Sequence, residues 1–300
     1  MKRRNLPGNP QYFNSKNVYI IPSSFGWAYA FVLLTLFFGA INYQVSLAFL
    51  MVFLIALMGL GSAWQGHANL KGLTIKLVSI DDTYEGKPAK INLLIFSQQK
   101  RFNLEFQVDK QASVTLENIE TQPLPCSLLL ETNKRGYFTL PPLKISSVFP
   151  LGLFKVWGYV YFEGKYYVYP EPLNPDFWPD PVPSLHNNPQ ELVGDDEVYD
   201  LKQVENPWAQ PNLIAWKIAA KDQGWYVKTM NKPTGNYWLF KLDDLKEKNL
   251  EKKLRYLSYW LLTAEQQGDF YSLQLNNAPT KFGRGNQHLQ RCLRQLAIYQ

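Results

Sequence analysis

The chain has 300 residues, of which 19% are charged, a net charge of +6, a pI near 9.0 and two cysteines. This length exceeds that of one compact soluble domain, so we expect a membrane segment and two modest folded units. The basic balance fits a nucleic-acid-binding protein or a membrane protein with cytoplasmic Lys and Arg, and does not distinguish them. Cys126 and Cys292 are far apart and lack metal-ligand spacing. That argues against a disulfide framework and a zinc site, and suits a reducing cytoplasm.

A long apolar stretch follows the first residues of the chain. No Asp, Glu, Lys or Arg occurs between Lys16 and Lys71. Since a helix needs ~20 residues to cross ~30 Å of hydrocarbon, the stretch holds two spans and a tight turn. We predict a transmembrane helical hairpin over 25–64, with helices near 25–43 and 45–64. The polar triplet Asn42-Tyr43-Gln44 is the expected turn, with Tyr43 at the lipid boundary.

Two other interpretations of this stretch are weaker. Buried helices of a soluble protein rarely carry apolar residues all round, and a signal peptide starts earlier and is not followed by a second apolar run. Residues 1–24 contain Lys2, Arg3, Arg4 and Lys16 but no acid, and Lys71 follows the hairpin. The positive-inside rule therefore predicts a bacterial inner-membrane protein with residues 1–24 and its soluble part in the cytoplasm.

Residues 70–169 change to a period of two. Apolar residues alternate with polar ones at 73, 75 and 77 and again from Phe102 to Val108. Half-buried antiparallel strands have this pattern, and the turn residues between the runs favour a small β-sandwich domain. The domain shows no evident nucleophile, His or carboxylate pair, so we interpret it as an interaction or spacer module.

A proline-rich linker is expected over 170–193, because seven prolines within some twenty residues exclude a helix or a central strand. An acidic cluster follows: Glu191, Asp195, Asp196, Glu197 and Asp200. Such a cluster could hold a cation, but a metal site needs converging ligands with fixed supports, and a run of acids in a polar loop is more often solvated.

The last part, 194–300, ends in a strand–helix–strand–helix pattern over 237–242, 247–267, 270–275 and 287–299. Both helical segments carry one apolar stripe, so we expect each to cover a sheet. This order predicts an α/β layer with a parallel strand pair. The predicted fold class is thus a multi-domain membrane protein: a two-helix transmembrane hairpin, a β-sandwich and a small α/β domain.

The segment NKRGYFTLPPLKISSVFPLGLFKVW, residues 133–157, resembles a bacterial family known as domain of unknown function 58. In that family a basic-Gly-Tyr-x-Leu-Pro-Pro strand precedes an aromatic-Pro-x-Gly-Leu-Phe turn. Gly136 and Gly152 are expected in turns, while Phe149, Leu153 and Phe154 are expected to fix a corner to a core. We interpret these residues as maintaining the fold.

A second segment is similar to the same family's Trp-Lys helix. Trp216 and Lys217 match that pair, while Lys221 and Lys202 replace two arginines of the pattern. The chain departs from the family at 207–212, where the family has Gly-Asp and an Arg. Lys217, Lys221 and Lys228 are candidates for a basic face that meets an acidic partner or anionic lipid. The simpler interpretation is that they are solvated and capping residues of an amphipathic helix.

The resemblance implies that the C-terminal part is half of a von Willebrand A-type fold, which often binds Mg²⁺ through Asp-x-Ser-x-Ser. Here the equivalent turn contains Asp243 and Asp244 but neither serine. We therefore predict no metal and no cofactor, and interpret both acids as residues at a helix N-terminus. Gly283-Arg284-Gly285 lacks the spacing of a phosphate loop and is expected to be a turn.

His67, His186 and His288 are isolated in the sequence, and no Ser/Cys-His-Asp arrangement is suggested, so we do not expect an enzyme. The resemblance implies a membrane-anchored accessory protein often associated with MoxR-type AAA+ ATPases. Our prediction is a non-catalytic adaptor or scaffold acting with such an ATPase in protein assembly, maturation or envelope stress; another membrane protein is the other expected partner. The alternatives are an envelope-active hydrolase with an unrecognised site, or a binder of anionic lipid; nucleic acid is not expected as a partner.

Overall fold

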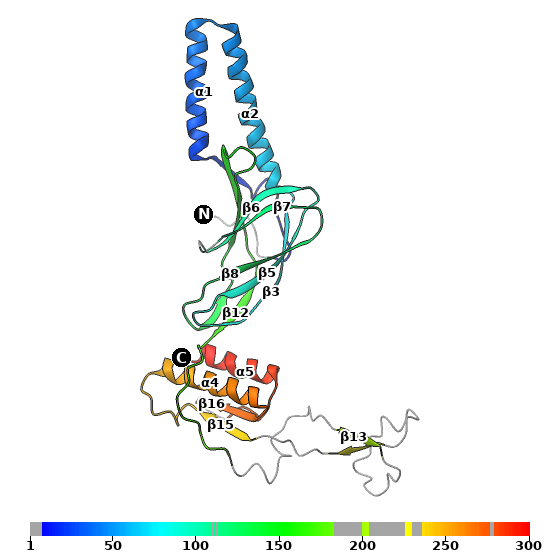
Figure 1. The fold of residues 1–300 in the computed structure, drawn as a ribbon, viewed down its shortest axis with the longest axis vertical. Coiled ribbons are helices and arrows are strands. Elements are labelled where there is room, and N and C mark those ends of the chain that lie inside the picture. The colour runs from blue at the N-terminus through cyan, green and yellow to red at the C-terminus, as the bar shows by residue number, and fades with distance from the viewer. Residues whose placement is uncertain are drawn as a thin grey trace. The chain divides into compact units, whose positions relative to one another are not determined.

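The computed structural model describes residues 8–109, 111, 113–182, 200–203, 226–229, 236–276 and 279–300. The chain forms two compact units, Met1–Tyr169 and Pro170–Gln300 (Figure 1). Each unit is described by itself below.

Two long helices form an antiparallel hairpin in the first unit (Figure 1): α1 spans Ser24–Tyr43 and α2 spans Ser46–Leu70. The Ser23 hydroxyl caps α1 by accepting a hydrogen bond from the Gly26 N–H at 2.9 Å. Gln44, with φ of 51°, ends α1 in the left-handed region. The predicted helices agree with this hairpin except at the end of the second one, and of the predicted turn Asn42-Tyr43-Gln44 only Gln44 lies outside the helices. The prediction ended the second helix at 64, but α2 continues to Leu70 because its last turn packs into the sheets that follow.

Two antiparallel sheets make up most of the rest of the first unit. The first has the order β1 (Gln11–Tyr12), β3 (Thr74–Ile80), β5 (Ala89–Phe96), β8 (Leu124–Leu130). The second has the order β2 (Tyr19–Pro22), β11 (Phe154–Val160), β10 (Leu143–Ser147), β6 (Arg101–Val108), β7 (Ser113–Ile119). A smaller sheet pairs β4 (Thr83–Tyr84), β12 (Lys165–Tyr169) and β9 (Gly136–Thr139). We call these strands together the sheet domain.

The sheet domain has one apolar core. Ile75, Ile91 and Ile95 of the first sheet and Leu104 and Phe106 of the second are each 0% exposed and belong to the same buried cluster. The alternation in the sequence therefore predicted correctly which of these strand residues are buried, since successive strand side chains point to opposite faces. The structure confirms a sheet-rich region directly after the two helices.

The described residues before the hairpin, 8–23, belong to the sheet domain, whereas the sequence predicts 1–24 as a separate flanking segment. Gln11 and Tyr12 pair with Ile75 and Thr74, so β1 borders the first sheet. The strand β2 pairs with β11, bordering the second. Phe13 lies between them and is 2% exposed. Both ends of the hairpin consequently emerge from the same domain.

The second unit contains a parallel pair of strands, β15 (Tyr237–Lys241) and β16 (Phe270–Gln274), joined through helix α4 (Leu250–Gln267). A second helix, α5, spans Asn286–Ile298, and β13 (Asp200–Gln203) pairs antiparallel with β14 (Tyr226–Thr229). The predicted parallel pair is confirmed. The helix predicted from 247 starts at Leu250, because the Asn249 side chain accepts from the Glu251 N–H and caps it there.

The described part of the predicted linker, 170–182, is packed against α4 and β15. The Ser258 hydroxyl donates to the Pro170 carbonyl at 3.0 Å, and Arg255 forms an ion pair with Glu171. Trp178 contacts the rings of Trp238, Phe240 and Trp260 edge-on. The chain forms neither a helix nor a strand there, and its aromatic residues make it a layer of the second unit.

Candidate functional site

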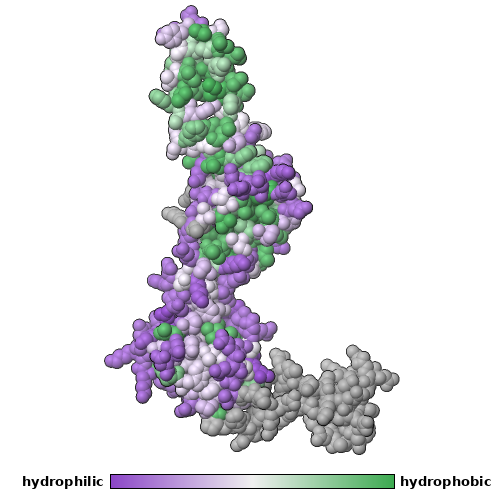
Figure 2. Space-filling view, in the orientation of Figure 1, coloured by the Kyte–Doolittle hydropathy of each residue, from purple (hydrophilic) through white to green (hydrophobic). Residues whose placement is uncertain are grey.

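The outer surface of the hairpin is apolar. Figure 2 shows hydrophobic side chains over most of the visible face of both helices. Only 11% and 17% of the most apolar windows of α1 and α2 are buried, and both helices are long and apolar enough to cross a membrane. The most exposed large side chains include Phe31 at 72%, Leu57 at 70% and Trp64 at 79%. A solvated helix pair would present polar groups at such positions, so this surface suits lipid.

Two hydroxyl groups of α1, those of Tyr29 and Thr35, have partners inside the hairpin. The Tyr29 hydroxyl donates to the Ile55 carbonyl across the pair, and the Thr35 hydroxyl donates to the Phe31 carbonyl at 2.9 Å. At Gly59 a Cβ would lie 3.1 Å from the Tyr29 ring. The absence of a side chain there lets the two helices approach closely, as small residues do between membrane helices.

The C-terminal end of α2 is held by a buried arginine of β6. Arg101 is 4% exposed, and its guanidinium donates to the Ala68 carbonyl, to the Lys71 carbonyl at 2.7 Å and to the Ser97 hydroxyl at 2.9 Å. The last carbonyls of a helix have no partner inside it and carry partial negative charge. Burial lowers the pKa of Arg101. The side chain therefore closes the helix end with a cation, and we call this contact the Arg101 cap.

Asn69 adds a second link between α2 and the sheets. Its amide donates to the Phe102 carbonyl at 2.7 Å and to the Ser147 hydroxyl at 3.1 Å, and its oxygen accepts from the Phe102 N–H at 3.0 Å. Asn69 thus makes with the Phe102 backbone the same two hydrogen bonds that a residue of a neighbouring strand would make. The final turn of α2 is thus fixed to β6 and β10.

A turn between β10 and β11 contacts the ends of both helices; we call residues 148–153 the base turn. Ser23 donates its N–H to the Leu153 carbonyl at 2.8 Å and its hydroxyl to the Gly152 carbonyl at 2.5 Å. A Cβ on Gly26 would overlap the Leu153 carbonyl, and one on Gly66 would lie 3.0 Å from the Phe149 carbonyl. The base turn lies in the segment that carries the family resemblance, and Leu153 is 1% exposed, as expected for a residue fixing a corner.

The residues singled out in the Trp-Lys segment fall mostly outside the described residues. Lys202 is in β13, opposite Val227, and Lys228 is in β14, opposite Leu201. Trp216, Lys217 and Lys221 lie outside the described part of the chain. The predicted basic face is therefore still a prediction. Of the acidic cluster, only Asp200 is described, as the first residue of β13.

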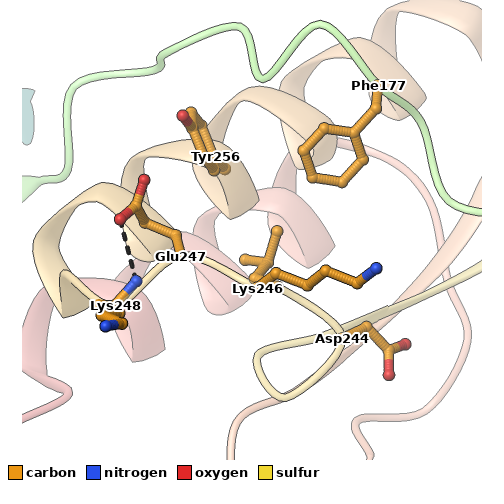
Figure 3. A pocket seen from close by; sticks show the side chains of 7 residues that line it. Phe177, Asp244, Lys246, Glu247, Lys248 and Tyr256 are labelled. Carbon is orange, nitrogen blue, oxygen red and sulfur yellow. Dashed lines mark hydrogen bonds between the residues drawn. The ribbon is translucent and has the colours of Figure 1, made fainter.

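The second unit has one notable pocket among the described residues, a cavity of about 540 Å³ after the carboxyl end of β15. Figure 3 shows that Phe177 and Tyr256 line one side of it, and the loop with Asp244, Lys246, Glu247 and Lys248 lines the other. Asp243 and Asp244 lie in this loop and not in the first turn of α4, contrary to our prediction, because the helix starts only at Leu250.

The carboxylate of Glu247 in this loop is paired with a lysine of α4. The Glu247 carboxylate accepts from the Lys252 ammonium at 2.7 Å and from the Lys248 N–H at 2.9 Å, and the hydrogen bond from Lys252 is the main reason that the Glu247 pKa is lowered. A carboxylate held ionised in this way is a poor proton donor. Within the described residues, no group of three or more His, Cys, Asp and Glu side chains could hold a metal ion.

His288 and Cys292 are neighbours on α5, with Nε2 and Sγ 3.7 Å apart. They are nevertheless not arranged for nucleophilic catalysis. The His288 Nε2 lies 3.0 Å from the Tyr271 carbonyl, which only accepts, so this nitrogen carries the proton and cannot take one from the thiol. Burial also raises the pKa of the Cys292 thiol to about 12. The pair is part of the packing between α5 and β16.

No known family model and no curated protein matches this chain. The family named above therefore stays a resemblance carried by two short segments. Sequence analysis missed the Arg101 cap and the Asn69 link, because each of them joins side chains and backbone groups that lie thirty or more positions apart in the chain.

Proposed function

We propose that this chain is a membrane-anchored, non-catalytic adaptor whose hairpin crosses the bacterial inner membrane and whose sheet domain and second unit face the cytoplasm. The observation that carries this proposal is the connection of both hairpin ends to one domain. Ser23 with the base turn holds α1, and the Arg101 cap with Asn69 holds α2. A domain fixed to two membrane helices keeps a defined orientation at the bilayer, which is what a scaffold requires.

The cytoplasmic side is supported by charge. Lys16 and Lys71 flank the apolar hairpin, and the turn between its helices has no charged residue. Lys and Arg within a few residues of a membrane helix stay on the cytoplasmic side. The partner that fits the resemblance is a MoxR-type AAA+ ATPase, with a role in protein assembly, maturation or envelope stress.

The first experiment is a topology measurement with single cysteines. Both native thiols are buried, so an introduced, exposed thiol dominates labelling by a membrane-impermeant maleimide. Gln44→Cys, at the hairpin tip, is expected to react in spheroplasts, while Glu117→Cys, on β7, is expected to react only after lysis. Both of these positions are exposed.

The reverse labelling pattern overturns the cytoplasmic orientation and favours the alternative of an envelope-active hydrolase. The partner is tested separately by floating vesicles that contain the full chain with a purified MoxR-type ATPase from the same bacterium. Flotation of the ATPase with these vesicles and not with protein-free ones supports the adaptor. Equal behaviour of the two vesicle preparations refutes the proposed partner.

A further inference from the structure

Exposed apolar side chains continue from the hairpin onto the adjoining edge of the sheet domain. Val148 and Leu151 of the base turn are 46% and 47% exposed, and Ile20 and Ile21 of β2 are 39% and 49% exposed. All four are large aliphatic residues at turn or edge positions, where polar residues are usual. Val78 and Leu129 are also exposed elsewhere on the sheet domain, but these four residues lie beside the hairpin, and a group of apolar side chains in that place marks an interaction surface.

The contacts of the base turn place this patch at the level where α1 begins and α2 approaches its end. The turn bonds to Ser23, one residue before α1, and packs on Gly26 and Gly66. Twenty residues of α1 rise ~30 Å, the thickness of the hydrocarbon layer, so the start of α1 lies at the lipid boundary if the helix spans it. The patch therefore lies in the same boundary layer.

Aromatic residues at this end of the hairpin fit the same layer. Trp27, in the first turn of α1, is 66% exposed, and Trp64, near the end of α2, is 79% exposed. On the neighbouring strands Tyr19 and Trp157 stack with ring centroids 5.8 Å apart. Trp and Tyr gather at membrane–water interfaces because one part of the ring is apolar and the other is wet.

We propose that the base turn and β2 form a third lipid-contacting element, in which Val148, Leu151, Ile20 and Ile21 insert into the interfacial layer of the bilayer beside the two helices. The bilayer is the expected occupant because the base turn and β2 adjoin the lipid-facing hairpin, and because a lipid layer can contact both Ile20 and Ile21 although consecutive strand side chains point to opposite faces. The contact sets the tilt of the sheet domain on the membrane. This inference rests on the proposed membrane anchoring.

The test measures the depth of single positions in the full chain, reconstituted in vesicles of phosphatidylcholine and phosphatidylglycerol. Leu151→Cys is labelled with an environment-sensitive fluorophore, and quenching is compared between lipids that carry a spin label near the glycerol end or near the methyl end of the acyl chain. The buried native thiols, Cys126 and Cys292, leave the introduced one as the reactive group.

The matched control is Leu129→Cys, another leucine with a similar exposure of 54%. Leu129 of β8 pairs with Lys90 of β5, six positions from Phe96, which pairs with Thr74 just after α2. At ~3.4 Å per residue the control is ~20 Å further from the hairpin along the strand. Leu57→Cys, on the exposed surface of α2, reports the membrane span itself.

The expected result is that labelled Leu151→Cys loses most of its emission to the shallow quencher and less to the deep one, with a blue-shifted maximum. Labelled Leu129→Cys should keep its emission with both quenchers, and Leu57→Cys should respond to the deep quencher. If Leu151→Cys behaves like Leu129→Cys while Leu57→Cys is quenched, the lipid-contacting turn is refuted and the anchor is retained. If Leu57→Cys is not quenched, the membrane anchoring fails.

Discussion

Replacing Arg101 by Met removes the cation that closes α2 while keeping an unbranched side chain in the same space. The change leaves the Ala68 and Lys71 carbonyls without their donor in a region where Arg101 itself is 4% exposed. The Ser97 hydroxyl loses a partner as well. We expect a strong loss of stability in the first unit.

The magnitude follows from these contacts. Each buried acceptor left unsatisfied costs about 1–3 kcal/mol, so the two carbonyls together account for about 2–6 kcal/mol. The lost cation at the helix C-terminus adds about 0.3–1 kcal/mol. The variant no longer has to bury a guanidinium, and burying an ion costs several kcal/mol, so this saving offsets part of the total. A net loss of about 3 kcal/mol remains, which is about 6–12 °C in Tm for a unit of this size.

The assay is thermal unfolding in detergent, followed by near-ultraviolet circular dichroism, to which the stacked Tyr19 and Trp157 contribute. Lys100→Met is the control, because this adjacent cation is 70% exposed and its 3.9 Å ion pair with Glu120 is equally exposed. Such pairs contribute little, so its Tm should stay within about 2 °C of the parent. If Arg101→Met lowers Tm no more than Lys100→Met, the Arg101 cap does not stabilise the hairpin end.

Three further predictions concern packing, pH and thiol reactivity. Gly66→Val should destabilise the first unit by about 1–3 kcal/mol because its Cβ meets the base turn, whereas Gly61→Val, with nothing within 4 Å, should have little effect in the same melting assay. Burial lowers the pKa of His288 in the folded state, so its contribution to stability is complete above its ordinary pKa of 6.5 and is lost as the pH falls below that value. The Tm of the second unit should therefore drop between pH 7 and 5.5, and His288→Gln should flatten this drop; an unchanged slope contradicts the assignment. Cys126 and Cys292 should both resist maleimide at pH 8 in the folded chain and react after denaturation, since burial raises the pKa of each thiol; labelling of the native chain would refute their burial.

Several local features were predictable because they depend on neighbours in the sequence. The hairpin followed from the uncharged stretch between Lys16 and Lys71, and the strands from alternating residues such as Leu104 and Phe106. The parallel strands β15 and β16 followed from the order of elements, which admits few topologies. Boundaries were less accurate: α4 starts at Leu250 because Asn249 caps it, and the apolar stripe alone does not locate a cap.

Because hydrophobic periodicity is a local property, the amino-acid order alone indicates two apolar helices before a sheet-rich region and an α/β layer after it. How the helices are held is visible only in the folded chain. Arg101 looks like an ordinary polar residue of a strand beside Lys100, yet it is buried because the end of α2 arrives there with unpaired carbonyls. The strand β1 has two residues, too few for any period to show. Contacts between distant segments depend on the whole fold, and no window of the sequence contains both partners.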